Sequence, residues 1–384
     1  MPEIRVKFRH TTTGLRATLT ADDGAEQGQI ALDAPVALRS VAIPKPWGQE
    51  IWFSGSEARG ESSIMQGTTT ITLSDYLALD PDRLANHAQP LLLKILDPAP
   101  QAVTGNLYFE THDTKQEVYV VTHVDHSAWP DAVGAIRLGM NQTLRKTYPS
   151  DAEFRAAYLE AVNSYEHIRR ELDHPERDET QSDAQILKEE QELRTAMESF
   201  TASVPLRVGD VVQVGTGIPH SLQHGVRVFE FQTPTYERNI ISFNQKVLTQ
   251  DHWDSSYAIN TMSLDGPQPP DIVLLHEGEG VRVERIVNFA EFAVQRITIE
   301  PGQTYAPPAQ PGYTMLALIA DTKEMMAEVH TRAGAITLSH ETPAVFVPAS
   351  AVDLSVTGKQ QPTTVLLAHP NPAAAGTMPH STKA

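Results

Sequence analysis

Short runs in which apolar and polar residues alternate cover most of the chain, and this pattern is typical of half-buried strands. Examples are the segments 4–8 and 226–232, and the segment 118–124, VYVVTHV, is rich in residues that favour strands. Between residues 150 and 172 the pattern changes, because apolar residues then recur at every third or fourth position, as they do on one face of a helix. The sequence therefore predicts a mainly β protein that is interrupted by a helical segment.

The helical segment has a recognisable start and two apolar stripes. Ser150 followed by Glu153 matches a capping box, which marks the N-terminus of a helix. One apolar stripe runs through residues 154–172 and a second through residues 186–200. We interpret both stripes as packing faces, and we expect an α-helical insertion domain over residues 129–202.

The strand-rich parts on either side of this insertion predict two β domains. Residues 1–128 and 203–250 are expected to form one discontinuous domain. Residues 272–370 have the rhythm of another small sandwich or barrel, with strands separated by Gly, Pro and Asp turns. The histidines of this second domain are scattered along it, so we expect it to be metal-free.

The segment 105–120, GNLYFETHDTKQEVYV, holds three metal-ligating residue types within a strand pattern. Side chains two apart on a strand point to the same face, so Glu110 and His112 are expected to project together. Residues 113–115 predict a tight turn. Glu117 then begins a returning strand and can face the same pair. Two carboxylates and an imidazole at one place suit a divalent metal ion.

A fourth ligand is predicted about a hundred residues later, in the segment 209–220, GDVVQVGTGIPH. Valines make a strand there, Gly215 and Gly217 permit a sharp bend, and His220 follows Pro219. A single histidine after a strand is usually a turn or core residue. Taken together, however, the two constrained spacings favour one metal site that contains Glu110, His112, Glu117 and His220.

Composition limits the possible chemistry. The chain has no cysteine, which excludes disulfides and thiolate ligands. Its 30 basic and 48 acidic residues give a formal net charge of −18, which argues against a nucleic-acid partner. An anionic substrate therefore needs local Lys and Arg side chains. There is no apolar run long enough for a membrane span, and the N-terminus lacks the apolar core of a signal peptide, so we expect a cytoplasmic location.

Two further features are ambiguous. Trp47 and Trp52 fit either the core or a pocket wall, and Trp47 is kept as a candidate substrate contact. Lys94 interrupts the apolar run 91–96, LLLKIL. A buried lysine is costly unless its amine reaches water or an anion, so Lys94 either extends to the edge of the sheet or lines a polar cavity.

The two motifs together resemble the signature motifs of the cupin superfamily, and the order of motifs along the chain resembles type I phosphomannose isomerases more narrowly. That order is Trp-Gly, Leu-Leu-Leu-Lys-Ile, ligand-x-His, Lys-x-Glu-x-Tyr, a helical insertion, Gly-Ile-Pro-His and Glu-x-Gln…Arg. The resemblance implies two cupin-type β domains plus an inserted helical domain. It also implies a zinc-dependent enzyme that interconverts mannose 6-phosphate and fructose 6-phosphate, a small-molecule sugar phosphate being its partner.

The same resemblance assigns roles to individual residues. The metal ligands are Glu110, His112, Glu117 and His220, which would hold one Zn²⁺ per chain, although another divalent metal remains possible. The catalytic residues are Arg238 beside the reacting oxygens, Glu230 as the candidate base, and Lys115 as a residue that orients a hydroxyl or Glu117. The candidate substrate-binding residues are Lys94, near the phosphate, and Trp47.

This chain departs from the family at three positions. Glu110 stands where the family has a glutamine ligand, which adds a negative charge at the metal and lowers its Lewis acidity. Tyr108 replaces a serine that contacts phosphate in the family. Asn244 stands in place of a lysine, with Lys246 nearby. The metal pocket is therefore kept, whereas the phosphate pocket is changed.

Three alternatives remain compatible with the sequence. One is a cupin sugar isomerase that acts on a different or unphosphorylated sugar, which the Tyr108 replacement favours. Another is a non-enzymatic protein that binds a sugar or a metal. The third is an iron or manganese dioxygenase, because cupin ligands also suit those metals. The oligomeric state is left open.

Overall fold

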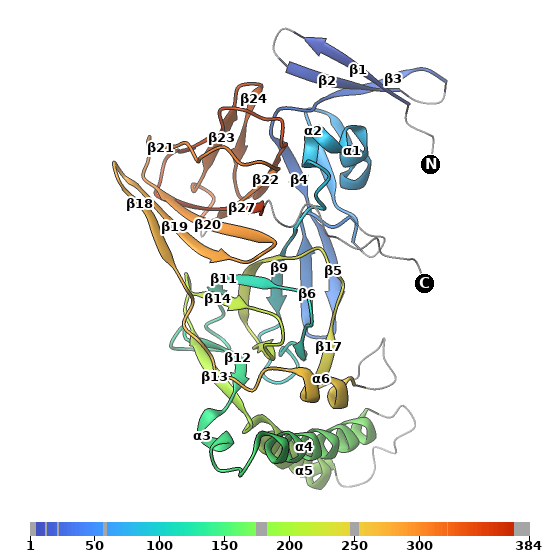
Figure 1. Cartoon of the computed structure of the whole chain (residues 1–384), viewed down its shortest axis with the longest axis vertical. Coiled ribbons are helices and arrows are strands. Elements are labelled where there is room, and N and C mark those ends of the chain that lie inside the picture. The colour runs from blue at the N-terminus through green and yellow to red at the C-terminus, as the bar shows by residue number, and fades with distance from the viewer. Residues whose placement is uncertain are drawn as a thin grey trace. The chain divides into compact units, whose positions relative to one another are not determined.

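Antiparallel strands make up most of the fold, as the alternating pattern predicted, and the longest helices lie in the predicted insertion (Figure 1). The computed structural model describes residues 5–11, 14–20, 23–56, 60–173, 183–245, 253–320 and 322–371. The chain divides into two compact units. Unit 1 contains residues 1–43, 51–94 and 270–384, and unit 2 contains residues 44–50 and 95–269.

Unit 1 is built on a nine-stranded sheet of order β18-β19-β20-β27-β22-β25-β4-β7-β8. Its strands are β18 (Val273–Gly278), β19 (Val281–Asn288), β20 (Phe292–Ile299), β27 (Thr363–Pro370), β22 (Thr314–Ile319), β25 (Ala344–Val347), β4 (Val36–Arg39), β7 (Ser63–Gln66) and β8 (Thr69–Thr72). Central strands such as β22 and β25 are buried along nearly their whole length, which explains their continuous apolar sequences.

Two smaller sheets and two short helices complete unit 1. One sheet has the order β1-β2-β3 and the other β21-β26-β23-β24. Their bounds are β1 (Arg5–Thr11), β2 (Gly14–Thr20), β3 (Glu26–Ala31), β21 (Thr304–Tyr305), β26 (Ser355–Gly358), β23 (Ala327–Thr331) and β24 (Gly334–Leu338). The helices, α1 (Leu73–Leu79) and α2 (Pro81–Ala85), are capped at their N-termini by the side chains of Thr72 and Asp80.

Unit 2 contains the two sheets that carry the predicted motifs. The five-stranded sheet has the order β13-β12-β15-β10-β17, with β13 (Thr201–Leu206), β12 (Gly134–Met140), β15 (His220–Leu222), β10 (Phe109–Thr111) and β17 (Asn239–Ser242). The six-stranded sheet has the order β14-β11-β16-β9-β6-β5, with β14 (Val211–Val214), β11 (Glu117–Val124), β16 (Val226–Gln232), β9 (Leu92–Pro98), β6 (Gly48–Trp52) and β5 (Val41–Lys45). The boundaries between the two units fall inside β5, β6 and β9.

The helical insertion leaves and re-enters unit 2 through a pair of hydrogen-bonded strands. β12 pairs with β13, and Met140 stands opposite Thr201, so the two ends of the insertion are held together. Between them lie α3 (Gln142–Arg145), α4 (Asp151–Leu172) and α5 (Asp183–Glu198). The Ser150 hydroxyl accepts the Glu153 N–H at 3.2 Å, which confirms the predicted N-cap of α4.

The two long helices pack against each other, as Figure 1 shows, and the apolar stripe of α4 is buried. The Tyr165 hydroxyl of α4 donates to Glu190 of α5 at 3.0 Å. The structure also contains a short helix, α6 (Ser255–Thr261), in the stretch 245–271, where the sequence showed little periodicity. α6 is too short to carry a helical period of its own, and burial of Ala258 and Ile259 holds it in place.

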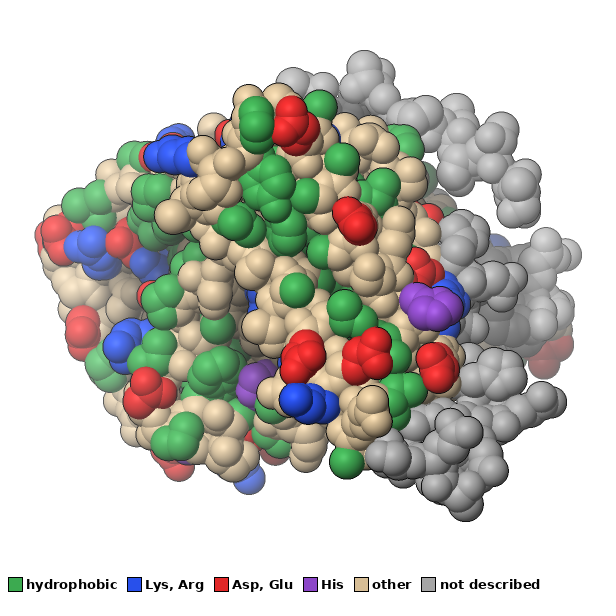
Figure 2. All heavy atoms as spheres, turned by 90° about the horizontal axis from the view of Figure 1, so that it is seen from below, with side chains coloured by type: hydrophobic (Ala, Val, Ile, Leu, Met, Phe, Trp, Pro, Cys, Tyr) green, Lys and Arg blue, Asp and Glu red, His purple; other side chains and the backbone are tan. Residues whose placement is uncertain are grey.

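The predicted three-domain boundaries remain a prediction about independent folding units. The division by contacts groups residues 1–43 and 51–94 with the C-terminal strands, and β12 lies inside the predicted helical domain 129–202. Among the described residues no helix is long and apolar enough to span a lipid bilayer. On the face seen in Figure 2, Lys and Arg side chains are scattered among acidic and neutral ones and form no continuous basic patch.

Candidate active site

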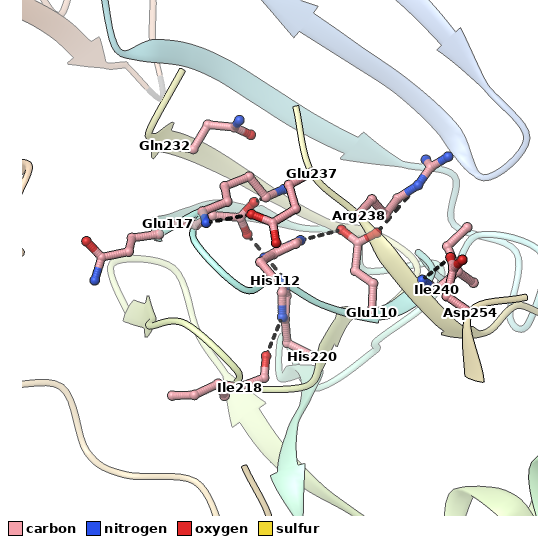
Figure 3. A network of polar contacts seen from close by, with 12 residues as sticks. Glu110, His112, Glu117, Ile218, His220, Gln232, Glu237, Arg238, Ile240 and Asp254 are labelled. Atoms are coloured by element: carbon pink, nitrogen blue, oxygen red, sulfur yellow. Dashed lines mark hydrogen bonds and ion pairs between the residues drawn. The ribbon is translucent and has the colours of Figure 1, made fainter. Parts of the chain in front are cut away.

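Side chains from both predicted motifs converge inside unit 2 (Figure 3). One potential ligand atom from each of Glu110, His112 and His220 lies within 4.8 Å of the other two. Both histidines are buried, and Glu110 is partly buried. Among the described residues these three form the one group of His, Asp and Glu side chains with this spacing.

Strand pairing brings the distant motifs together. Glu110 on β10 stands directly opposite His220 on β15 in the five-stranded sheet. His112 follows the end of β10, and its carbonyl oxygen accepts the N–H of Gly217 at 2.7 Å. Gly217 has a φ of 72°, a left-handed conformation that favours glycine, so the GTGIP bend can reach back to the first motif.

Each histidine is oriented by a neighbour. Nδ1 of His220 lies 3.0 Å from the carbonyl oxygen of Ile218, to which it donates, and this contact turns Nε2 toward Glu117. Nε2 of His112 lies 3.3 Å from Oε1 of Glu110. Burial, and then the charge of Lys115, lower the pKa of His112, which favours the neutral imidazole that metal ions bind.

Glu110 is held ionised by its surroundings. Burial raises the pKa of this carboxyl, but the contact with His112 and the charges of Lys115 and Arg238 outweigh burial and lower the pKa to about 2. Oε2 of Glu110 lies 3.8 Å from Nε of Arg238 and has no hydrogen-bond partner among the described residues. Glu110 therefore presents a negatively charged oxygen to the group.

Glu117 contacts the same group through His220. Its Oε2 lies 3.2 Å from Nε2 of His220 and accepts the hydroxyl of Tyr119 at 2.5 Å, while its Oε1 forms an ion pair with Lys115. Burial raises the pKa of Glu117, but Lys115 and the two histidines outweigh it and lower the pKa. Burial and the Glu117 charge raise the pKa of Tyr119, which keeps its hydroxyl protonated.

These donors fit a divalent metal ion. In a tetrahedral site with metal–ligand bonds near 2.0–2.1 Å, neighbouring ligand atoms lie about 3.3 Å apart. The His112–Glu110 and His220–Glu117 contacts are 3.3 and 3.2 Å. Two imidazoles and carboxylates suit Zn²⁺ and also Fe²⁺ or Mn²⁺. Whether Glu117 is a fourth ligand or only the partner of His220 stays a prediction.

Arg238 lies beside Glu110 and packs on an aromatic ring, a contact that the sequence did not predict. Its guanidinium lies 4.4 Å from the centre of the Tyr108 ring, in cation–π geometry. The Tyr108 ring in turn packs on Phe243, with ring centres 4.2 Å apart. Burial lowers the pKa of Arg238, but Glu110 and other neighbours outweigh burial and raise it, so the guanidinium stays charged.

The other predicted site residues lie in different surroundings. Glu230 is 1% exposed on β16, and its strand position is opposite Tyr119 on β11. Trp47 is 1% exposed and belongs to the hydrophobic core of unit 2, as the core interpretation expects. Lys94 is buried on β9 and belongs to unit 1. Their predicted roles are taken up below as proposals.

The position expected to carry a phosphate-binding lysine faces the helical insertion instead. The side-chain amide of Asn244 contacts the hydroxyl of Tyr165 on α4, with Oδ1 at 3.1 Å from the hydroxyl oxygen. Lys246, the nearby alternative, lies outside the described residues. Asn244 therefore links the five-stranded sheet to α4.

Sequence reasoning assigned no role to two residues of this site. Tyr119 lies two positions after Glu117 on β11, so strand alternation alone could have placed both on one face. Glu237 had no comparable signal, because the backbone groups it binds lie 122 to 124 positions away in the sequence.

Comparison with known proteins gives a likeness of fold. No family model matches the sequence, and no curated protein matches it. Among solved structures, mannose 6-phosphate isomerase from Bacillus subtilis matches with a TM-score of 0.64 at 14% identity, over 88% of this chain and 99% of that chain. A mutant of phosphomannose isomerase from Salmonella typhimurium matches with a TM-score of 0.63 at 11% identity, again over 88% and 99%.

A zinc-bound mannose 6-phosphate isomerase matches with a TM-score of 0.62 at 12% identity, over 88% of this chain and 99% of that chain. The predicted resemblance to type I phosphomannose isomerases is thereby confirmed as a likeness of fold. The predicted fold class, mainly β with cupin-type domains and a helical region, is confirmed with it.

Proposed function

We propose that this protein is a metal-dependent aldose–ketose isomerase that interconverts mannose 6-phosphate and fructose 6-phosphate through an enediol. The observation that carries the proposal is the buried group of Glu110, His112 and His220 with the Arg238 guanidinium beside it. This group lies in a chain whose fold is that of mannose 6-phosphate isomerases. Fold alone does not specify a reaction, whereas the residues of the site do.

Glu110, His112 and His220 would hold the metal, with Glu117 as the fourth ligand and one Zn²⁺ per chain. A bound zinc ion supplies Lewis acidity that polarises the carbonyl of the sugar and stabilises negative charge on its oxygen. Lys115 keeps Glu117 ionised through their ion pair and so keeps a carboxylate beside His220. Another divalent metal would fit the same donors.

Arg238 supplies a fixed positive charge near the reacting oxygens. Its guanidinium stacks on Tyr108 and faces Glu110, so its position is set before a substrate arrives. Glu230 is the candidate base that moves a proton between adjacent carbons of the sugar. It is buried on the strand next to Tyr119, and a positioned general base contributes about 10²–10⁴-fold to the rate.

Lys94 and Trp47 complete the proposal as substrate contacts. Because the chain has a formal net charge of −18, a sugar phosphate needs a local cation, and Lys94 is the candidate on β9. The substrate is a small molecule, and we propose no nucleic-acid or membrane partner. We keep the expectation of a cytoplasmic location as part of this proposal.

A second candidate is a sugar isomerase that acts on an unphosphorylated sugar. Tyr108 favours it, because an aromatic ring packed between Phe243 and Arg238 stands where a phosphate-contacting serine was expected. In that case hydroxyl groups, rather than a phosphate, would orient the sugar. Parallel assays with mannose and mannose 6-phosphate distinguish the two substrates.

The main test is turnover by the zinc-loaded protein. We expect fructose 6-phosphate to form from mannose 6-phosphate, and we expect the activity to vanish in EDTA and return with zinc. His220→Ala should lower kcat/KM and zinc affinity by at least about 100-fold, since a ligand matters at least as much as the groups that orient it. His330→Ala, which changes a histidine on β23 of unit 1, is the matched control and should behave as wild type.

One result would refute an isomerase altogether. If zinc binds tightly in a His220-dependent manner but neither hexoses nor hexose phosphates turn over, the hexose isomerase is refuted and a binding protein is favoured.

A further inference from the structure

The carboxylate of Glu237 binds a row of backbone N–H groups in the turn that follows His112. Oε1 accepts the N–H of Asp113. Oε2 accepts the N–H of Thr114 at 2.9 Å, the N–H of Lys115 at 3.1 Å and the Thr114 hydroxyl at 2.5 Å. We call this set of contacts the Glu237 clamp.

The clamp has the chemistry of an anion held in a backbone nest. Successive N–H groups in a turn can point at one place and favour a negative charge there. Hydrogen bonds to an ionised acceptor are about twice as strong as neutral ones. Burial raises the pKa of Glu237, but the Thr114 hydroxyl and the three N–H groups outweigh it and lower the pKa.

The clamp joins two segments that are distant in the sequence and that both carry proposed functional groups. The turn 113–115 contains Lys115, whereas Glu237 immediately precedes Arg238. At the other end of the loop that leads to Arg238, Gln116 and Thr233 exchange two bonds. The Gln116 N–H donates to the Thr233 hydroxyl at 3.1 Å, and the Thr233 N–H donates to the Gln116 carbonyl at 3.1 Å.

The loop 233–238 is therefore fixed to the first motif at both of its ends. His112 is held independently of the clamp, because its carbonyl oxygen accepts the Gly217 N–H. Loss of the clamp should thus free Arg238 and Lys115 more than it disturbs the metal ligands.

We propose that Glu237 is a positioning residue, which sets Arg238 and Lys115 relative to the metal ligands and does not touch the substrate. The inference rests on the proposed function where it concerns turnover, but the clamp can also be tested without turnover. Groups that orient the residues of a metal site change affinity or activity by about 10–100-fold when they are removed.

The test compares Glu237→Ala and Glu237→Gln with two variants of neighbouring hydrogen bonds. Asp254→Asn weakens a carboxylate bond of 3.0 Å to the Ile240 N–H, on the strand that follows Arg238. Tyr257→Phe removes a bond of 2.7 Å to the Asp113 carboxylate, on the same turn but outside the clamp. Both neighbouring bonds are polar contacts of unit 2, so these variants control for a general loss of stability.

We expect Glu237→Ala to lower kcat by about 10–100-fold while the affinity for zinc, measured by chelator competition, stays close to that of wild type. Glu237→Gln should lose less, because its amide oxygen can still accept one or two of the N–H groups. Both controls should keep kcat. A Glu237→Ala protein with wild-type kcat, or one whose zinc affinity falls as much as its kcat, would overturn the proposal.

Hydrogen exchange tests the role of Glu237 independently of the proposed isomerase activity. In the zinc-loaded protein, exchange in the peptide that contains residues 113–115 should accelerate in Glu237→Ala and not in Asp254→Asn. If wild type turns over no sugar but this acceleration is seen, the function is refuted and the clamp stands. Unchanged exchange overturns the clamp whatever the activity.

Discussion

The two units bury different kinds of side chain inside similar antiparallel sheets. In unit 1, the core between β19, β20, β22 and their neighbours consists of Val, Ile, Leu and Ala side chains. In unit 2, the strands β10, β11 and β15 bring Glu110, Glu117 and His220 together, next to an apolar core of their own. The same architecture therefore serves packing in one unit and a charged cluster in the other.

This difference between an apolar core and a charged cluster indicates which residues stabilise the fold and which serve function. Burying apolar side chains stabilises the fold roughly in proportion to the area removed from water. Burying charges stabilises little even when they are paired, and removing one partner is costly. Lys115 with Glu117 and Arg238 with Glu110 are such pairs. A cluster of this kind is expected where the groups take part in binding or catalysis. A substitution in the core of unit 1 should therefore lower mainly the unfolding free energy, whereas a substitution in the site should lower mainly the affinity for zinc.

The largest expected effect is on the stability of unit 1. Phe346 on β25 is fully buried, with the Tyr313 ring stacked at 5.1 Å and the Tyr76 ring at 6.1 Å in edge-on geometry. Phe346→Ala should lower the free energy of unfolding by about 3–5 kcal/mol, because it leaves a cavity. Urea denaturation measures the loss. Zinc affinity should not change in the folded variant; a parallel loss of zinc affinity would show that the units are not functionally separate.

A smaller effect, mainly on the affinity for zinc, is expected from a substitution of Glu110. Glu110→Gln removes a negative charge beside the metal site but keeps the shape of the side chain. We expect zinc affinity to fall about tenfold, because one anionic donor is lost. The unfolding free energy of the metal-free protein should fall by about 1–3 kcal/mol, less than in Phe346→Ala, because the substitution removes the charged partner of Arg238 while the amide still fills the same space. Chelator competition and urea denaturation give the two values, and a large loss of stability without metal would break the contrast.

The smallest expected effect lies on the surface of unit 1 and depends on pH. Glu284 accepts hydrogen bonds of 2.9 Å from both Arg282 and Arg296. Burial raises the pKa of Glu284, but the two arginines outweigh it and lower the pKa. The folded pKa thus lies below the unfolded value of about 4.3, so this stabilisation is fully present above that value and is lost as pH falls through the folded pKa.

Glu284→Gln should therefore destabilise the protein by about 0.5–1 kcal/mol at pH 7, and the difference from wild type should close below about pH 4. Urea midpoints at several pH values measure it. Glu341→Gln, at an exposed position of the same unit, is the matched control. A difference that stays constant with pH would mean that the carboxylate charge is not its cause.

Much of the local structure follows from periodicity and short motifs. Strand-favouring residues predict β11, alternation predicts β16, and the Ser150 capping box with its apolar stripe predicts α4. Both depend on neighbours within a few positions, which the sequence displays directly. Residue type and spacing likewise suggested Glu110, His112 and His220 as a group, and the structure brings these three together.

What only the tertiary structure decided are the contacts between segments far apart in the chain. The sequence does not say that Glu237 binds the turn 113–115, that Tyr108 carries Arg238, or that Asn244 faces α4. Such contacts depend on strand register and on loop paths, and side-chain pattern within one segment carries no information about either. The amino-acid sequence thus determined the helices, the strands and the candidate metal ligands. Tertiary packing determined which charged side chains lie next to those ligands.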